Sequence, residues 1–387
     1  MGTYIIGYTL IGIVVLFITF SILVKKKVLF GNTYSIQKIF GAPLLHYSIR
    51  RIGSALISVT LAIIVTFFLL RAAQPAQAYC DKHFADPHVL ASVNELNCNT
   101  WKANMGYDGS IGSQLVRFFY AILPFPKTVF LTEVNTDTMS YTITSAKTFV
   151  INLGRIYEGP APDGTLVSDY IIDKMFVSFR IGIFSVILEL ALGYPFGILM
   201  AKYQNGIFDK IGKAYIITID AIPGVAYYYI WMSLLCGVIG LPYIFKAENP
   251  LSYLPAILTS GFTGMAGIGL WVRRYMVDEF NSDYVKFARS KGLSERRIMG
   301  IHILRNAIVP LVRTFPSAVI GALMGSYFLE AIYGIPGLGG ALLKAVNSSN
   351  ACLLQGLIII SAYLSIISYL LGDIVTAVVD PRISFSK

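Results

Sequence analysis

Residues 353–379 read LLQGLIIISAYLSIISYLLGDIVTAVV, a continuous apolar run in which Asp373 is the single charged side chain. A helix needs about 20 mostly apolar residues to cross a bilayer. Lipid offers no partner to a free N–H or C=O group, so a run of this length has to be helical inside a membrane. The stretch therefore predicts a membrane-spanning helix.

Six other apolar runs of similar length occur along the 387 residues, and together they predict an all-α polytopic membrane protein. They cover residues 4–24, 52–73, 177–200, 214–240, 253–272 and 307–332. Charged residues make up 13% of the chain, about half the share expected of a soluble domain. An outer-membrane barrel is excluded because its strands are short and alternate in hydropathy.

The net charge of +10 raises the possibility of nucleic-acid binding. We exclude that partner because the basic residues flank the apolar runs, where they act as topology signals in a lipid bilayer. The first run, 4–24, has no basic leader before it, and Lys25, Lys26 and Lys27 follow it. We therefore expect a retained helix instead of a cleaved signal peptide.

Lysine and arginine placement predicts the orientation. The segment 25–51 has six basic residues and no acid, 202–213 has three lysines and one acid, and 273–305 has eight basic residues against four acids. These three segments are expected in the cytoplasm. The alternation places the N-terminus outside and the C-terminus inside.

The same pattern divides the chain into five parts. We expect an extra N-terminal helix within 1–30, a basic linker at 31–51, a first core helix at 52–73, an extracytoplasmic insertion at 74–174 and a core bundle at 175–387. Within the insertion, residues 138–150 (TMSYTITSAKTFV) alternate between apolar and polar side chains, which predicts one or two strands.

Between two runs lies the segment 282–310, SDYVKFARSKGLSERRIMGIHILRNAIVP. Ser282 is expected to cap a short helix over 283–291, Gly292 to end it in a left-handed conformation, and Ser294 to cap a second helix. Both helices are expected to lie flat outside the membrane. Ala288 and Gly292, four residues apart, are expected to share one face on which another surface can approach closely. A ring of basic side chains surrounds it: Arg289, Lys291, Arg296 and Arg297.

A solvated basic loop that only sets topology is the simpler reading of this segment. The ordered string Ala288-Arg289-x-Lys291-Gly292-Leu293-Ser294-Glu295-Arg296-Arg297, followed by His302-x-Leu304-Arg305-Asn306-Ala307, resembles the diagnostic cytoplasmic loop of ABC importer permeases in the peptide and nickel branch. The run 334–339, GIPGLG, resembles the B-type subunit of that branch. The resemblance implies six core helices, to which the run 4–24 and the long insertion are additions.

In that family the loop docks on an ATPase subunit. The residues that the resemblance assigns to ATPase coupling, within a coupling helix at 282–297, are Phe287, Ala288, Arg289, Lys291, Gly292, Leu293, Ser294, Glu295 and Arg296. The resemblance also implies a second, C-type permease, two ATPase subunits, an extracytoplasmic peptide-binding protein and location in a bacterial cell membrane. The chain contains no GxxxxGK[ST] phosphate loop, so we expect no catalysis and no bound cofactor, with ATP and Mg on the partners.

Other functions fit parts of the sequence. A self-sufficient secondary transporter or channel would need internal repeats and charged broken helices, and a structural scaffold would use 282–297 as an adaptor site. Within the family, dipeptides or nickel could replace oligopeptides. We favour oligopeptides, because a nickel route would place histidines or carboxylates in the runs, and no run contains histidine.

Two further groups of residues are candidates for specific contacts. Cys80 and Cys98 could form a disulfide, remain free thiols, or bind zinc with His83 and His88, although the spacing is not a standard zinc pattern. We predict no metal site. Asp220 and Arg313 each lie near the start of an apolar run, and we predict that they pair within the membrane.

The glycine-rich run 334–340 follows the apolar run 307–332. The family resemblance places it near an outer gate, and an ordinary connecting loop explains it equally well.

Overall fold

The computed structural model describes residues 42–379 apart from residues 74, 124, 136–139, 157–159, 163, 313 and 349. The expected helix at 4–24 lies outside the described residues. The described part of the chain divides into two compact units, one with the residues up to 173 and residues 341–366, and the other with residues 174–340 and 367–379. The boundaries between the units fall within three helices, which are α7 (Val167–Lys202), α16 (Leu338–Asn347) and α17 (Ala351–Val379).

The first unit combines one long helix with a small mixed region. Its helices are α3 (Ala42–Ala73), α4 (Ala76–His83), α5 (Ala91–Asn104) and α6 (Ile111–Ile122), and its strands are β1 (Lys127–Asn135), β2 (Ser140–Phe149), β3 (Arg155–Ile156) and β4 (Thr165–Leu166). Strands β1 and β2 form an antiparallel hairpin with an irregularity between Leu131 and Thr132, and β3 pairs with β4. The strand expected within 138–150 is therefore confirmed as β2.

Local hydrogen bonds define the ends of α6. The hydroxyl of Ser110 accepts a hydrogen bond from the Ser113 amide at 3.3 Å, which caps the first turn. At the other end, the buried ammonium group of Lys127 donates to the carbonyls of Ala121 and Leu123, at 2.8 and 2.7 Å, and also to that of Tyr120. A cation at the C-terminal end of a helix interacts favourably with the negative end of the helix dipole.

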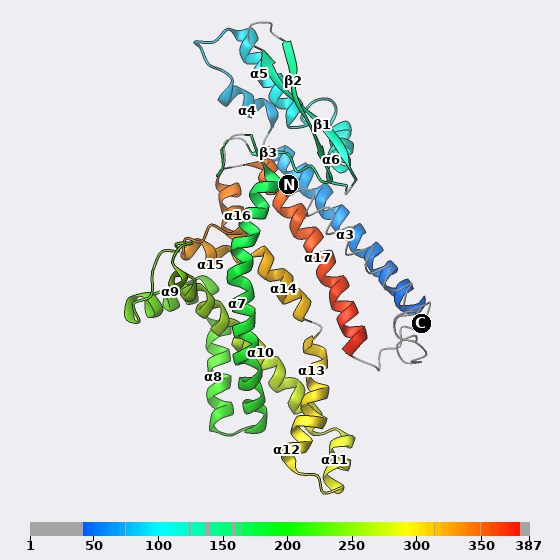
Figure 1. Ribbon diagram of the computed structural model, residues 1–387, viewed down its shortest axis with the longest axis vertical. Coiled ribbons are helices and arrows are strands. Elements are labelled where there is room, and N and C mark those ends of the chain that lie inside the picture. The colour runs from blue at the N-terminus through cyan, green and yellow to red at the C-terminus, as the bar shows by residue number, and fades with distance from the viewer. Residues whose placement is uncertain are drawn as a thin grey trace. The chain divides into compact units, whose positions relative to one another are not determined.

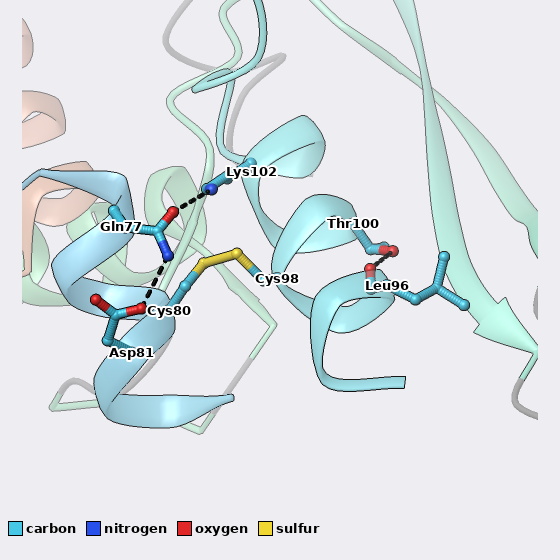
Figure 2. Close-up of a disulfide and its surroundings, with 7 residues drawn as sticks. All are labelled: Gln77, Cys80, Asp81, Leu96, Cys98, Thr100 and Lys102. Atoms are coloured by element: carbon cyan, nitrogen blue, oxygen red, sulfur yellow. Dashed lines mark hydrogen bonds between the residues drawn. A yellow bond between two sulfur atoms is a disulfide. The ribbon is translucent and has the colours of Figure 1, made fainter. Parts of the chain in front are cut away.

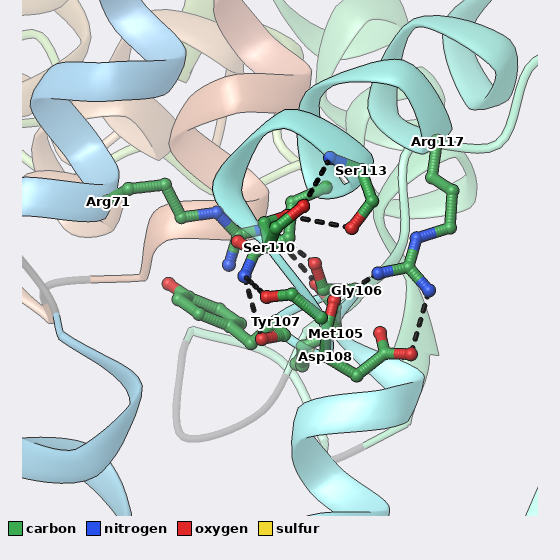
Figure 3. Close-up of polar contacts among 10 residues, drawn as sticks. Arg71, Met105, Gly106, Tyr107, Asp108, Ser110, Ser113 and Arg117 are labelled. Carbon is green, nitrogen blue, oxygen red and sulfur yellow. Dashed lines mark hydrogen bonds and ion pairs between the residues drawn. The ribbon is translucent and has the colours of Figure 1, made fainter.

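A stack of aromatic rings joins α4 and α5 to the end of α3. Tyr79 stacks on Trp101 with ring centres 4.0 Å apart, and Trp101 stacks on Tyr107 at 5.3 Å. The guanidinium of Arg71, in the last turn of α3, lies 3.4 Å from the centre of the Tyr107 ring and donates to the carbonyls of Met105 and Gly106 (Figure 3). Burial raises the pKa of Tyr107 above its usual value, so the ring facing Arg71 carries a neutral hydroxyl.

A disulfide between Cys80 and Cys98 connects α4 to α5 (Figure 2). Beside it, Lys102 donates to the side-chain oxygen of Gln77 at 3.0 Å, and Gln77 donates to Asp81 at 2.8 Å. The bond uses both sulfur atoms, which leaves neither thiolate for the alternative zinc site.

Among its described residues, the second unit contains helices and connecting loops and no strand. After α7 come α8 (Ile207–Ala221), α9 (Gly224–Met232) with a π-helical turn at Ser233–Val238, a 3₁₀ turn at Pro250–Tyr253, α10 (Leu254–Phe280), α11 (Asp283–Ser290), α12 (Glu295–Arg297), a π-helical turn at Ile298–Ile303, α13 (Leu304–Val312), α14 (Phe315–Met324) and α15 (Tyr327–Ile332). Figure 1 shows α11 and α12 beyond the ends of α10 and α13.

Small residues allow α7 to pack closely on α10. A Cβ atom at Gly193 would lie 2.7 Å from Ile268, and one at Gly197 would lie 2.6 Å from the carbonyl oxygen of Gly269. The two glycines are four residues apart and therefore share one face of α7, as in the small-residue interfaces of membrane helices. This contact helps to hold the centre of the second unit.

Five helical segments of the described chain are long and apolar enough to cross a membrane, or six if one bent pair counts as a single span. These segments correspond to the six expected runs that fall within the described residues. The helices extend beyond the apolar runs: α3 begins at Ala42, α7 begins at Val167 and α10 continues to Phe280. Helical hydrogen bonding continues into the polar residues that flank each run, and hydropathy alone does not predict these helical extensions.

The apolar run expected to span at 214–240 is broken in the structure. The direction of the helix changes by 112° between α8 and α9, at Ile222 and Pro223. Proline disfavours helical backbone in the residue before it, and Ile222 accordingly adopts an extended conformation with ψ of 129°. The apolar run continues through the break, so hydropathy did not reveal it.

The expected span at 307–332 is also interrupted. Helix α14 ends at Met324, and Gly325 follows with a φ of +69°, a conformation that favours glycine. A separate short helix, α15, then begins at Tyr327. The interruption places Glu330 on an element of its own.

Candidate functional site

The segment 282–297, between α10 and α13, contains a helix that ends in a Schellman motif. Gly292 has a φ of +71°, the left-handed conformation expected from the sequence. The Leu293 amide donates to the carbonyl of Ala288 at 3.3 Å, and the Gly292 amide donates to that of Arg289 at 2.9 Å. A Cβ atom at Gly292 would meet nothing within 4 Å, so the backbone conformation, and not lack of space within the chain, favours glycine here.

Ser282 and Ser294 occupy the expected N-cap positions, but their side chains do not cap. Both residues have extended backbone, and neither side chain accepts a hydrogen bond from a following amide. The Ser282 hydroxyl instead donates to the carbonyl of Glu279, at 2.7 Å, which ties α11 back to the end of α10. The expected N-cap positions are therefore confirmed, but neither serine makes the side-chain hydrogen bond of a cap.

The two small residues of the segment do not share an exposed face. Ala288 is buried, and it packs with Val285 in a core cluster that includes Met276, Ile303 and Ala307. Gly292 is exposed. Helix α11 ends at Ser290, so residues 288 and 292 are not brought to the same face by helical spacing. The expected close-approach surface of Ala288 and Gly292 is therefore absent, and the buried face of α11 belongs to the core of α10 and α13.

The outward face of α11 carries one large apolar side chain. Phe287 is 60% exposed, and the ammonium of Lys291 lies 4.4 Å from the centre of its ring. Arg289 forms an ion pair with Glu295 at 2.9 Å across the turn, and Lys286 pairs with Asp283 at 2.9 Å. The Lys286 partner lowers the pKa of Asp283. With five basic and two acidic residues, the segment presents an aromatic ring within a positive surface.

The second expected helix is not a separate element lying flat outside the spans. Helix α12 continues through the π-helical turn Ile298–Ile303 into α13, and the whole stretch 295–332 is one of the candidate spans. Ile298 and Ile303 are fully buried, which draws this stretch into the core.

A hydrogen-bonded pair also links α10 to α11. Tyr284 donates to the carboxylate of Glu279, and it lies 3.4 Å from the carbonyl of His302. Burial, together with the hydrogen bond to Glu279, raises the pKa of Tyr284. The phenol therefore stays protonated and keeps donating across the ordinary pH range.

An ion-pair cluster that sequence reasoning missed connects α8 to α10. The carboxylate of Asp209 is fully buried and accepts from Arg273 at 2.5 and 2.9 Å, from Lys213 at 3.0 Å and from the Asn205 amide at 2.9 Å. Asn205 has a φ of +61° in the turn between α7 and α8. The spacing of Asp209 and Lys213 was a possible signal, but these residues were read only as orientation markers.

The expected pair of Asp220 and Arg313 cannot be placed, because Arg313 lies outside the described residues. Asp220 itself is exposed near the end of α8. Among the residues that the structure describes, no cluster of three His, Cys, Asp or Glu side chains could hold a metal ion.

Comparison with known proteins places these elements in a family. Residues 193–385 match the family model described as binding-protein-dependent transport system inner membrane component. The matched region includes the segment 282–297, the Asp209 cluster and α15, whereas the strands and the disulfide lie before it.

Several relatives of the chain are described as peptide permeases. It is 36% identical over 264 residues to the oligopeptide transport system permease protein AmiC of Streptococcus pneumoniae, an alignment that covers 63% of this chain and 53% of AmiC. It is 31% identical to the oligopeptide transport system permease protein AppB of Bacillus subtilis, covering 57% of this chain and 73% of AppB. It is 30% identical to the dipeptide transport system permease protein DppB of Lactococcus lactis, covering 55% and 70%. The chain spans about half the length of AmiC.

Proposed function

Since this chain belongs to the family of binding-protein-dependent transport system inner membrane components, we propose that it is the permease subunit of an ATP-driven oligopeptide importer. It forms the translocation path with a second permease subunit, and an extracytoplasmic binding protein delivers the peptide. Separate ATPase subunits supply the energy, because the sequence contains no GxxxxGK[ST] phosphate loop.

The observation that carries the coupling role is the two-sided arrangement of α11. Its outer face exposes Phe287 and basic side chains, whereas Val285 and Ala288 on the inner face are buried in the same cluster as residues of α10 and α13. A force applied to the outer face is therefore transmitted to two spans through close-packed side chains. A flexible basic loop without a buried face would not transmit it.

Coupling also requires a difference between states. A partner can shift a two-state bundle only by as much as its contacts differ between the two states. We propose that the ATPase grips the 282–297 segment and that its nucleotide-driven movement displaces α11, and with it the ends of α10 and α13.

Oligopeptides are the proposed substrates because AmiC and AppB carry that description. DppB is described as a dipeptide permease, so dipeptides, together with nickel, are the competing substrates. Uptake of radiolabelled peptides of two to six residues and of nickel ions, measured in proteoliposomes, separates them. Highest uptake for peptides longer than two residues supports the proposal.

The decisive experiment purifies the tagged chain after co-expression with its candidate ATPases, second permease and binding protein. We expect the ATPases and the second permease to co-purify, and peptide uptake to require ATP. Isolation of the chain alone with ATP-independent uptake would instead indicate a secondary transporter.

Gly292→Glu tests the docking position within that complex. A bulky acid on the exposed turn should abolish uptake while the protein remains inserted. Gly292→Asn is the matched control, because asparagine tolerates a positive φ and adds no charge. Normal uptake by Gly292→Glu would contradict docking at this turn.

A further inference from the structure

Glu330, on α15, is a buried carboxylate that accepts hydrogen bonds from a neutral hydroxyl and a backbone amide. Its side chain is 3% exposed within the second unit. The hydroxyl of Ser178, on α7, donates to Oε1 at 2.6 Å, and the Gly340 amide donates to Oε2 at 2.9 Å. Charged groups are costly inside a membrane bundle and generally indicate function when they occur there.

Ser178 relays the contact to a second amide. Its oxygen accepts a hydrogen bond from the Leu338 amide at 2.7 Å while its proton is donated to Glu330. Leu338 and Gly340 are the first and third residues of α16. Glycine precedes this helix at position 337, so no neighbouring side chain caps it. Two residues from other helices therefore satisfy amides of its first turn, where the helix dipole also favours a negative charge.

The surrounding backbone leaves space only for the carboxylate. A Cβ atom at Gly325 would lie 2.1 Å from Oε1, and one at Gly337 would lie 2.5 Å from Oε2. Gly325 also has a φ of +69°. The two glycines thus form a close cradle around the carboxylate, and the packing fixes its position.

The cradle lies next to two of the places where the chain passes between the units. Helix α7 enters the second unit at Lys174, one helical turn before Ser178. Helix α16 leaves that unit after Gly340, whose amide Glu330 accepts. Within the second unit, the Glu330 carboxylate therefore hydrogen-bonds to α7 close to residue 174 and to α16 at residue 340.

We infer that Glu330 is a positioning residue: through Ser178 and the first turn of α16, it fixes the directions in which α7 and α16 join the second unit. The connections at 173/174 and 340/341 then move with α15 as one body. The consequence for transport rests on the proposed function, because a permease that alternates between two states needs defined connections between its moving parts. The clamp itself does not depend on that function.

Hydrogen–deuterium exchange of the solubilised full-length chain tests the clamp directly. Glu330→Gln keeps the shape, but its amide nitrogen cannot accept a hydrogen bond, so one contact is lost. We expect amides 338–340 to exchange at least 10-fold faster, while those of α11 are unchanged. Ser178→Ala should have the same local effect on amides 338–340. If Glu330→Gln instead exchanges faster throughout the chain because it is unfolded, the result for Ser178→Ala is the one that tests the clamp. Unchanged exchange of 338–340 in Ser178→Ala would overturn the inference.

ATP-driven uptake by the reconstituted complex tests the positioning role. We expect Glu330→Gln and Ser178→Ala each to lower the maximal rate about 10-fold without changing KM, and the double variant to be no worse than either single variant. The positioning role would be overturned if the rate losses of the two single variants multiplied in the double variant. A wild-type maximal rate in Glu330→Gln would overturn it as well. Glu248→Gln, which neutralises an exposed acid of the same unit, is the control. If wild-type complex shows no ATP-driven uptake, the proposed function fails, and the exchange experiment still decides the clamp.

Discussion

Arg273 on α10 and Asp209 on α8 form a bidentate ion pair, with Nε–Oδ1 and Nη2–Oδ2 distances of 2.5 and 2.9 Å. The Asp209 side chain is fully buried, and that of Arg273 is 15% exposed. Arg273 lies less than three turns before the end of α10, from which α11 follows directly. The pair therefore holds the α7–α8 turn against the helix that leads into the 282–297 segment.

We predict that Asp209→Ala destabilises the protein strongly. Removal of the Asp209 carboxylate leaves the largely buried guanidinium of Arg273 uncompensated, and breaking a buried ion pair in this way costs about 3–5 kcal/mol. Thermal unfolding of the solubilised protein should show a Tm lower by several degrees. The double variant Asp209→Ala with Arg273→Met should recover much of the loss, because it removes both charges. Lys210→Met, which neutralises an exposed neighbour, is the control, and a Tm for Asp209→Ala equal to that of this control would contradict the prediction.

A second prediction concerns the exposed ring of Phe287. Truncation to alanine should weaken binding of the ATPase by about 2 kcal/mol, roughly 30-fold in Kd, as is typical of an aromatic anchor at an interface. The Tm should not change, because the ring is 60% exposed in the isolated chain. Titration of the purified ATPase against the reconstituted permease measures the affinity.

Two variants frame that titration. Phe287→Leu preserves an apolar side chain and should retain most of the affinity. Val285→Ala, on the buried face of the same helix, should lower the Tm instead. Equal affinities for Phe287→Ala and wild type would show that the ring is not part of the docking surface.

Sequence patterns predicted the features that depend on local backbone or on apolar length. The apolar runs indicated the spans, and Gly292 indicated a left-handed turn because that requirement is a property of the backbone alone. The alternation in 138–150 indicated strand β2 for the same local reason.

The remaining features depend on contacts between distant residues, which local patterns do not encode. Ser178 and Glu330 are 152 positions apart, and Asp209 and Arg273 are 64 apart. Pro223 and Gly224 are local signals for a kink, but they are weak evidence for a full break because membrane helices often tolerate proline. Ala288 was assigned to a docking face because its burial against α10 and α13 becomes visible only once those helices are packed.

A third prediction concerns Lys127 in the first unit. Its ammonium donates to three carbonyls at and just after the end of α6, so Lys127→Met leaves those acceptors without a donor and should destabilise the region by about 1–3 kcal/mol. Hydrogen exchange should accelerate in the last turn of α6 and in β1. Lys82→Met, at an exposed position, should leave exchange unchanged. Protection of α6 in Lys127→Met equal to that in wild type would show that the lysine contributes nothing to the helix end.

The disulfide between Cys80 and Cys98 should stabilise the pairing of α4 with α5, because it closes a loop of 18 residues in the unfolded chain. The chain-entropy model assigns about 3 kcal/mol to a loop of this size. We predict that Cys80→Ala with Cys98→Ala increases the rate of limited proteolysis between α4 and α5 by at least 10-fold, and that reductant has the same effect on wild type but none on the double variant.

Alkylation of the denatured wild-type protein should label two cysteines, Cys236 and Cys352, without reductant and four with it. Four labelled cysteines without reductant would show that the bond is not formed, and proteolysis at the wild-type rate in the double variant would show that the bond does not stabilise this region.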